Sequence, residues 1–348
     1  HMAIDNDGVF WYDISFGGVA SFDGEKGKSY RLSDDLYGNS ALCLAADRDN
    51  VKWFGTQTGV VSFDGSEWRT YTTADGLAEN RAWSVAVDKE NVKWFGLDSK
   101  GVMSYDGKEW KSYPEVEGFD GQRVHYIAVD EDNGKWFCSF FNIIYYDDKV
   151  WKTYYREKEL PSKQVSCIEA GRNGEIWLWT DLGLMRFDGS AWKTYPESKT
   201  YVSSGVKDIT MDRNGVIWIA TAGGAFRFNG ASWKQYTWKD GLIHDNIETI
   251  VVDDRNVKWF CGSGGMTRFE ESGPLFALEA SHPSAFAAFG NYPNPFNPCT
   301  TISFTLLSPG KVTLSVYDIT GRKVRELLSG QVGAGNHLKV WDASGCAS

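Results

Sequence analysis

Short stretches in which apolar and polar residues alternate cover most of the chain. Residues 39–71, for example, contain the runs ALCLAAD, VKWFGT, VVSFDG and SEWRTY, and Asp, Asn and Gly separate these runs. Alternation with a period of two, rich in Val, Phe, Trp, Tyr and Thr, is typical of β-strands joined by hairpin turns. No segment keeps the i, i+3, i+4, i+7 apolar spacing of a helix over about 11 residues. The pattern therefore predicts four strands in this stretch.

A tryptophan recurs along the chain at intervals of 41 or 42 residues, at Trp11, Trp53, Trp94, Trp136, Trp177, Trp218 and Trp259. A fixed period of this size indicates a repeat architecture, and four strands per repeat are those of a β-propeller blade. The predicted fold class is all-β, with a seven-bladed β-propeller of four-stranded antiparallel blades at residues 3–281. A linker at 282–290 and a small incomplete β-sandwich at 291–348 are predicted to follow.

The repeated tryptophan is predicted to fill the wedge between neighbouring blades, where two twisted sheets face each other. In four repeats a lysine precedes it, at Lys52, Lys93, Lys135 and Lys258. Side chains alternate along a strand, so these lysines are expected on the opposite face of the blade or extending past it to water.

An aspartate stands six residues before the tryptophan in six repeats, at Asp5, Asp47, Asp88, Asp130, Asp212 and Asp253, and Gly171 replaces it in the fifth. Strings such as DEDNG look like calcium loops, but none has the Glu that an EF-hand needs at its twelfth position. Asx turns that close a hairpin explain the aspartates better. No metal site and no cofactor is predicted.

The repeat is specific enough to suggest a family. The strings DGLAENRAWSVAVDKENVKWFG and GVVSFDGSEWRTY resemble the two-component regulator propeller repeat, over roughly residues 3–281. In that family such repeats often form the extracytoplasmic sensor part of hybrid histidine kinases and recognise glycans. The resemblance therefore implies the propeller fold, whereas a kinase region is absent from this sequence.

The composition changes after residue 281. The proline-rich stretch SHPSAFAAFGNYPNPFNP indicates an extended linker, and short alternating runs follow it. NYPNPFNPCTTISFTL, VYDITGRKVREL and WDASG resemble the immunoglobulin-like sorting domain of the type IX secretion system, over residues 291–348. Members usually continue with one more strand, so the last strand is expected to be missing here. The resemblance implies the type IX secretion machinery as a partner and a secreted or cell-surface location.

Charge and apolar runs exclude two classes of protein. The formal net charge is −10, which argues against binding nucleic acid through a general basic surface. No stretch approaches the roughly 20 consecutive apolar residues of a membrane helix.

Cys43 and Cys167, and Cys138 and Cys261, lie three blades apart in the ring, too far for a disulfide. They are predicted to be buried free thiols.

Ring closure is a separate question. Only Met2, Ala3 and Ile4 precede Asp5 where other blades have a full first strand, so closure is expected to be imperfect or to need further residues. The run PLFALEA, residues 274–280, is the candidate for the outer strand of blade 7.

Candidate binding residues lie where loops between blades enter the first strands, because rigid strands there present variable side chains around one axis. The second position of this strand varies between blades: Leu42, Trp83, His125, Ser166, Lys207 and Glu248. The preceding loops add Arg81, Arg123, Lys163, Trp238, His244 and Asp245. An aromatic ring beside cations suits an acidic or neutral glycan. The candidate ligand-binding residues are Trp83, Arg123, His125, Lys163, Lys207, Trp238, His244 and Glu248, and a solvated channel mouth with unselected polar residues is the alternative.

These observations favour a secreted or cell-surface recognition propeller without catalytic residues, which binds an extracellular glycan or protein ligand at the mouth of the central channel. A polysaccharide or lactone lyase is the first alternative, with His125 or His244 as base and Lys207 neutralising charge. The sequence carries no nucleophile elbow, metal-ligand spacing or phosphate loop. A protein-interaction scaffold is the second alternative.

Overall fold

The computed structural model describes residues 2–14, 18–23, 26–30, 41–114, 116–119, 121–139, 142–155, 159–162, 164–202, 205–262, 265–270, 276–278, 286–292, 299–306, 310–317, 323–333 and 335–342. The chain divides into two compact units, residues 1–278 and 279–348. The first unit contains the repeats and the second contains the C-terminal strands.

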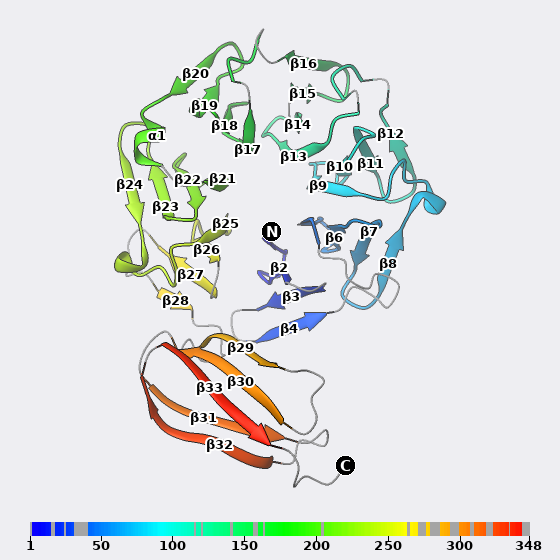
Figure 1. The fold of residues 1–348 in the computed structure, drawn as a ribbon. Helices are drawn as coiled ribbons and strands as arrows, with labels where there is room; N and C mark the ends of the chain where they lie inside the picture. Colours follow the sequence, from blue (N-terminus) through cyan, green and yellow to red (C-terminus); the bar gives the residue numbers. More distant parts are fainter. Residues whose placement is uncertain are drawn as a thin grey trace. The chain divides into compact units, whose positions relative to one another are not determined.

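Seven four-stranded antiparallel sheets surround a central axis in the first unit, which confirms the predicted seven-bladed β-propeller (Figure 1). Within each blade the strands follow one another outward in sequence order. The first strands, nearest the axis, are β1 (Met2–Ile4), β5 (Cys43–Ala46), β9 (Ala82–Val87), β13 (Val124–Val129), β17 (Val165–Ala170), β21 (Val206–Met211) and β25 (Ile247–Val252). The second strands are β2 (Phe10–Ile14), β6 (Lys52–Gly55), β10 (Lys93–Leu97), β14 (Lys135–Ser139), β18 (Ile176–Thr180), β22 (Ile217–Thr221) and β26 (Lys258–Gly262). The third strands are β3 (Gly18–Phe22), β7 (Val60–Phe63), β11 (Val102–Tyr105), β15 (Asn142–Tyr146), β19 (Gly183–Phe187), β23 (Gly224–Phe228) and β27 (Gly265–Phe269). The fourth strands are β4 (Gly27–Tyr30), β8 (Trp68–Tyr71), β12 (Trp110–Ser112), β16 (Trp151–Tyr155), β20 (Trp192–Tyr195), β24 (Trp233–Tyr236) and β28 (Phe276–Leu278).

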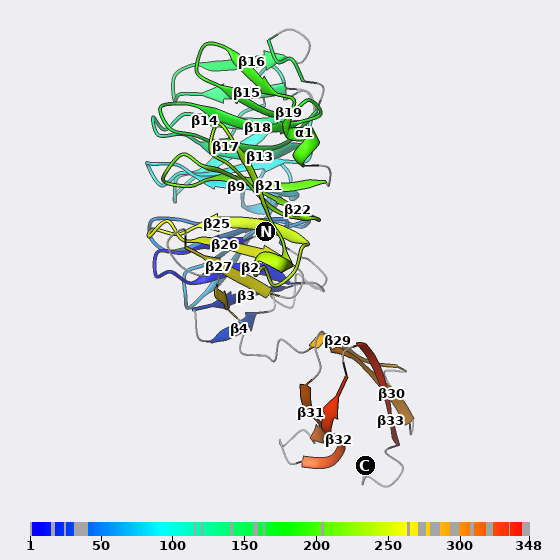
Figure 2. The same ribbon diagram turned by 90° about the vertical axis from the view of Figure 1, so that its left-hand side faces the viewer.

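The connections between strands lie on two faces of the ring, because neighbouring strands of a blade are antiparallel. The lower face carries the turns from first to second strand and from third to fourth. The upper face carries the turns from second to third strand and the connections from blade to blade. The helix α1 (Ser198–Tyr201) and two 3-10 turns, η2 (Thr73–Asp75) and η3 (Trp238–Asp240), belong to blade-to-blade connections. Figure 2 shows the ring from the side, with loops on both faces.

The repeated tryptophans fill the wedges between blades, as predicted. All seven are 6% exposed or less. Trp53 of blade 2 contacts Phe95 and Tyr105 of blade 3, with ring centroids 6.1 and 5.5 Å apart. A similar aromatic contact joins the other neighbours, in the pairs Trp11–Phe54, Trp94–Phe137, Trp136–Phe187, Trp177–Phe228, Trp218–Phe260 and Trp259–Phe10. An indole therefore makes an aromatic contact between each blade and the next.

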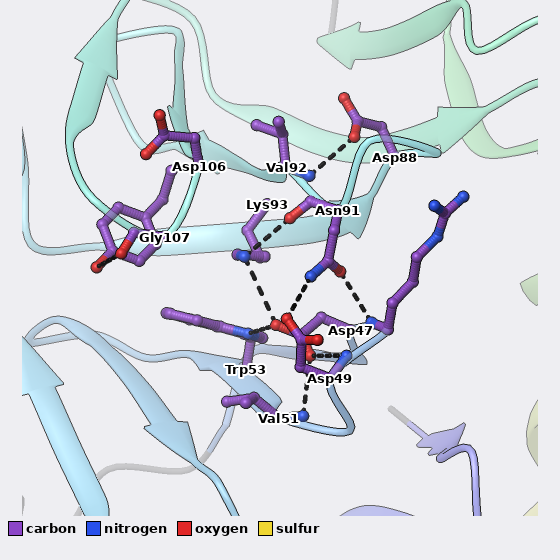
Figure 3. A network of polar contacts seen from close by, with 12 residues as sticks. Asp47, Asp49, Val51, Trp53, Asp88, Asn91, Val92, Lys93, Asp106 and Gly107 are labelled. Carbon is purple, nitrogen blue, oxygen red and sulfur yellow. Dashed lines mark hydrogen bonds and ion pairs between the residues drawn. The ribbon is translucent and has the colours of Figure 1, made fainter.

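A buried polar bridge also crosses several wedges, and Figure 3 shows the one between blades 2 and 3. Asp47 accepts hydrogen bonds from Trp53 Nε1 at 2.9 Å and from the backbone N–H of Asp49 and Val51 at 3.0 and 2.9 Å. The ammonium of Lys93, which comes from the next blade, lies 3.6 Å from the same carboxylate. Equivalent ion pairs are Lys52–Asp5, Lys135–Asp88 and Lys258–Asp212.

This bridge confirms the Asx turns and decides between the two positions expected for the lysines. The four lysines lie on the face opposite the tryptophan of their own blade and are 4% exposed or less, so they do not extend to water. An ammonium is stable there because the carboxylate of the preceding blade pairs with it. The tryptophan of that blade lies under it, with Lys93 Nζ 5.3 Å from the Trp53 ring centroid.

Blade 5 lacks the bridge. Gly171 stands at the aspartate position, and Ile217 of blade 6 stands at the lysine position. Trp177 Nε1 is buried and has no hydrogen-bond partner among the described residues. At this interface both the aspartate and the lysine are replaced, so neither charge of the bridge is buried there without the other.

The ring closes by side-chain packing between its first and last blades. The three residues of β1 all pair with β2, and β28 lies within the run expected to form the outer strand of blade 7. Met2 packs against Trp259 and Cys261 of blade 7, and the Phe10 ring centroid is 4.5 Å from that of Trp259. Closure therefore uses the same aromatic wedge as the other interfaces, and each blade is built from consecutive strands.

The second unit contains β29 (Phe286–Tyr292), β30 (Cys299–Leu306), β31 (Gly310–Tyr317), β32 (Lys323–Val332) and β33 (Gly335–Asp342). One sheet has the order β29-β30-β33, and β31 pairs with β32 in the other. Val312 and Leu314 of β31 are buried, and Trp341 of β33 packs against them. The two sheets thus share a small core, as in the predicted sandwich. β29 begins at Phe286, so part of the stretch expected to be a linker is a strand.

The four cysteines of the propeller, Cys43, Cys138, Cys167 and Cys261, are buried and free, as predicted. Burial raises the pKa of Cys43 and of Cys138 to about 12. These side chains are therefore thiols at neutral pH and behave as small apolar groups.

Candidate functional site

Bulges in the first strands position the variable residues of the upper face. In blades 3 to 7 the pairing between the first and second strands shifts by one residue. The residues left out of the ladder are Trp83, His125, Ser166, Lys207 and Glu248. A β-bulge redirects a side chain and often lies next to a binding site. The position that varies most in the sequence is therefore the one that regular strand pairing does not constrain.

Four side chains of blades 3 and 4 form a compact group, here called the arginine cluster: Arg81, Trp83, Asp98 and Arg123. Asp98 follows β10 and accepts hydrogen bonds from Trp83 Nε1 at 2.8 Å and from Arg123 Nε at 2.6 Å. Arg81 Nη1 lies 3.5 Å from the other oxygen of Asp98. The guanidinium carbon of Arg123 is 3.9 Å from the Trp83 ring centroid, and that of Arg81 is 5.6 Å away. The indole and the carboxylate together hold Arg123 in one orientation.

The charges in the arginine cluster act on its two titratable neighbours. Burial alone would raise the pKa of Asp98, but the hydrogen bonds from Arg123 and Trp83 and the charges of both arginines outweigh it and hold the pKa below its ordinary value. Burial, reinforced by the charge of Arg123, lowers the pKa of His125, and Asp98 opposes this shift. At neutral pH the site therefore has a carboxylate, two guanidinium groups and a neutral imidazole.

A second group joins blades 6 and 7. Lys207 forms an ion pair with Glu248, and its Nζ donates a hydrogen bond to Asn246 Oδ1 at 2.7 Å. Asn246 Nδ2 in turn donates to Glu248 Oε1 at 2.8 Å. The backbone N–H of Asn246 donates to His244 Nδ1 at 2.8 Å, so Nδ1 is the acceptor nitrogen of this imidazole. The charges of Lys207 and Glu248 compensate each other here.

Trp238 lies in the connection that leads into this second group. It begins η3, which has a capping box of Thr237 and Asp240, and its backbone N–H donates to Asp245 Oδ1 at 2.6 Å. The indole is 60% exposed, unlike the wedge tryptophans. A fixed turn thus presents a large aromatic ring to solvent, which is the geometry of a stacking platform.

The structure brings the candidate residues together in two groups. Trp83 and Arg123 touch each other, with His125 close by on β13, and Lys207, Glu248 and His244 are joined through Asn246. Lys163 lies outside the described residues. Asp98 was not among the site residues predicted from the sequence, although it organises the arginine cluster. Aligning the turns between second and third strands would not have singled it out, because Asp181 occupies the same position in blade 5.

Two carboxylates lie deeper on the first strands, and each reaches the first strand of the next blade. Glu169 accepts hydrogen bonds from the backbone N–H of Met211 at 3.0 Å and from Thr210 Oγ1 at 3.2 Å. Asp208 accepts from the N–H of Ile250 at 3.0 Å. Burial raises the pKa of Glu169 to about 7, with a smaller contribution from the charge of Asp208, while the hydrogen bonds oppose the rise. Burial also raises the pKa of Asp208.

The described parts of the chain contain neither a metal-binding cluster nor a membrane-spanning helix. In these parts, no three His, Cys, Asp or Glu side chains are grouped so that they would hold a metal ion. Nor does any described helix have the length and apolar character needed to cross a bilayer.

Residues 291–343 match the family of the secretion system C-terminal sorting domain. A search of curated proteins gave no match. The family match and the seven blades confirm the sorting domain and the propeller fold that the two resemblances implied. Because this domain is a type IX sorting signal, the chain is an extracellular propeller that is secreted or displayed at the cell surface.

Solved structures share the fold at low sequence identity. The structure of a streptogramin B lyase is 15% identical, with a TM-score of 0.63, and the match covers 79% of this chain and 92% of that one. PorZ, a surface component of the type IX secretion system of Porphyromonas gingivalis, is 16% identical, with a TM-score of 0.62. That match covers 99% of this chain and 55% of PorZ. Virginiamycin B lyase from Staphylococcus aureus is 15% identical, with a TM-score of 0.60 and coverage of 75% and 90%.

Proposed function

We propose that this chain is a noncatalytic recognition propeller that binds an extracellular glycan on its upper face, around the propeller axis. The observation that carries the proposal is the row of bulges in blades 3 to 7. The bulges release an indole, an imidazole, an ammonium and a carboxylate at one end of the first strands. The wedge tryptophan is the same in all seven blades and the aspartate before it in six, whereas the bulged position differs from blade to blade, which favours a binding role.

Two further observations support glycan binding. Trp238 presents an exposed ring on a rigid turn, and a sugar can stack its apolar face on such a ring. Lys207, Glu248 and Asn246 hold one another in place, so their remaining donors and acceptors are ordered before a ligand arrives. Ordered polar groups lower the entropy cost of binding.

An array of soluble glycans, including uronic-acid polymers, tests the proposal on the full chain. The wild type is expected to bind at least one glycan, and His125→Ala/Lys207→Ala is expected to lose that binding. Arg213→Ala is the control variant, because Arg213 lies in a turn of the lower face and is well exposed. Binding that survives in the double variant would remove this site from the proposal.

The same samples separate the alternatives. Ultraviolet absorbance of an unsaturated product on incubation with a bound polymer would indicate a lyase and overturn the noncatalytic proposal. The absence of both glycan binding and product would overturn it in favour of a protein-interaction scaffold.

A further inference from the structure

The arginine cluster leaves one hydrogen-bonding edge of Arg123 available. The guanidinium lies 3.9 Å from the Trp83 ring centroid, and its Nε is used by Asp98 at 2.6 Å. Neither Nη group of Arg123 has a partner among the described residues, and the side chain is 32% exposed. The end of the guanidinium is therefore a planar fork of N–H donors that faces no protein acceptor in this part of the chain.

The net charge of the cluster favours an anion at this fork. Arg81 and Arg123 carry two positive charges, and the lowered pKa of Asp98 keeps one negative charge between them. One positive charge remains uncompensated within the cluster. Arg81 is less available than Arg123, because its Nη2 donates to Gln57 Oε1 at 3.3 Å and its Nη1 faces Asp98.

We infer that the two Nη groups of Arg123 bind a carboxylate of the ligand, so the glycan that this face recognises contains a uronic acid. This inference rests on the proposed function. A carboxylate has two oxygens in one plane, which match the two donors of a guanidinium edge. Trp83 is then a positioning residue, because its face is covered by Arg123 and it is not itself a platform for the sugar.

A neighbouring imidazole gives an independent signal of occupancy. The charge of Arg123 is one of the causes that lower the pKa of His125, after burial, and Asp98 opposes it. A carboxylate bound to Arg123 offsets that charge, so the pKa of His125 is expected to rise when the ligand binds. A glycan that binds elsewhere on the propeller would leave His125 unchanged.

Calorimetry of the full chain with matched ligands tests the inference. The probes are an oligogalacturonate, its fully methyl-esterified form and a glucuronate-containing oligosaccharide. Methyl esterification keeps the sugar chain and removes the charge, so it is expected to weaken binding at least about tenfold. Arg123→Lys keeps the positive charge but removes the fork, and a loss of about tenfold is expected for the acidic forms alone. Arg213→Lys, on the lower face, is the matched control and is expected to bind as the wild type does.

The outcomes separate this inference from the proposed function. Equal binding of the acid and its methyl ester, or an unaffected Arg123→Lys variant, would overturn the carboxylate while glycan recognition stands. An acid-dependent complex in which the His125 pKa, followed by NMR, does not rise would also overturn it. If no uronic-acid probe binds but a neutral glycan does, only the inference fails. Binding of an acidic peptide amide in place of every glycan would overturn both.

Discussion

The bridge between Asp47 and Lys93 provides a test of what holds neighbouring blades together. Asp47→Ala removes the acceptor of Trp53 Nε1 and of two backbone N–H groups. It leaves the Lys93 ammonium buried without a carboxylate partner among the described residues, with the Asn91 carbonyl at 2.8 Å as its hydrogen-bond acceptor. Removing one partner of a buried ion pair typically costs about 3–5 kcal/mol. For a propeller of this size, that loss corresponds to a decrease in Tm of about 6–10 °C.

Removing the lysine instead of the aspartate is expected to reduce the stability of the fold by less. In Lys93→Ile, the Asp47 carboxylate keeps its three hydrogen bonds, and we expect a loss of about 1–2 kcal/mol. The ring already contains an aspartate without a lysine opposite it: at the interface between blades 4 and 5, Asp130 keeps the aspartate position and Ile176 occupies the lysine position. The double variant Asp47→Ala/Lys93→Ile leaves no buried charge, so it should be more stable than Asp47→Ala alone.

Thermal unfolding followed by circular dichroism measures all three variants at one pH. Arg213→Ala, which breaks an exposed ion pair with Asp254, is the control and should change stability by less than about 1 kcal/mol. A double variant no more stable than Asp47→Ala would refute the reasoning, because the unpaired ammonium would then not be the source of the loss. Equal losses for Asp47→Ala and Lys93→Ile would refute it as well.

Three further predictions concern buried groups. Because the folded pKa of Glu169 is raised to about 7, its contribution to stability is fully present below its unfolded pKa and is lost as the pH rises through about 7. Glu169→Gln should flatten the fall in Tm between pH 5 and pH 8 and be more stable than the wild type at pH 8, and an unchanged profile would contradict this. Gly171→Asp with Ile217→Lys rebuilds the bridge under Trp177, and denaturant unfolding should give the pair a stability above the sum of the single changes by about 1 kcal/mol, whereas additive effects would contradict the proposed pairing. Mass spectrometry after iodoacetamide treatment at pH 8 should find the propeller thiols unlabelled in the folded protein and labelled in denaturant, and labelling of the folded protein would contradict their burial; the four thiols are Cys43, Cys138, Cys167 and Cys261.

The number of blades and their packing could be predicted from the sequence because the period is fixed and the tryptophans are conspicuous. The partner of each lysine could not, since it lies in another blade, about one repeat away in the chain. The aspartates were correctly interpreted as turn residues, but one oxygen of Asp47 completes the turn while the other accepts from Trp53 and faces Lys93. A sequence pattern shows the local role of such a residue and does not show the contact between blades.

The position of the candidate residues at one end of the first strands could be predicted from the sequence, but the contacts between them could not. Variation at the second position of the first strand is the basis of the proposed site. The bulges that free this position leave a trace in the sequence, because Lys207 and Asp208 together separate the apolar Val206 and Ile209, where regular alternation would place one residue. Asp98 was missed because its role depends on Arg123, which comes from the following blade.

The positions at the blade interfaces vary little from repeat to repeat, and their role in stability explains why. Each blade interface needs an indole, and several need a carboxylate and an ammonium, so substitutions there cost stability. Bulged residues on the upper face make no ladder contacts of this kind, and they are free to change without loosening the ring. Arg123 illustrates the result: Trp83 and Asp98 hold it rigidly, while its Nη groups have no partner among the described residues. A rigid ring that leaves a polar edge unsatisfied at one end has the preorganisation that selective binding requires.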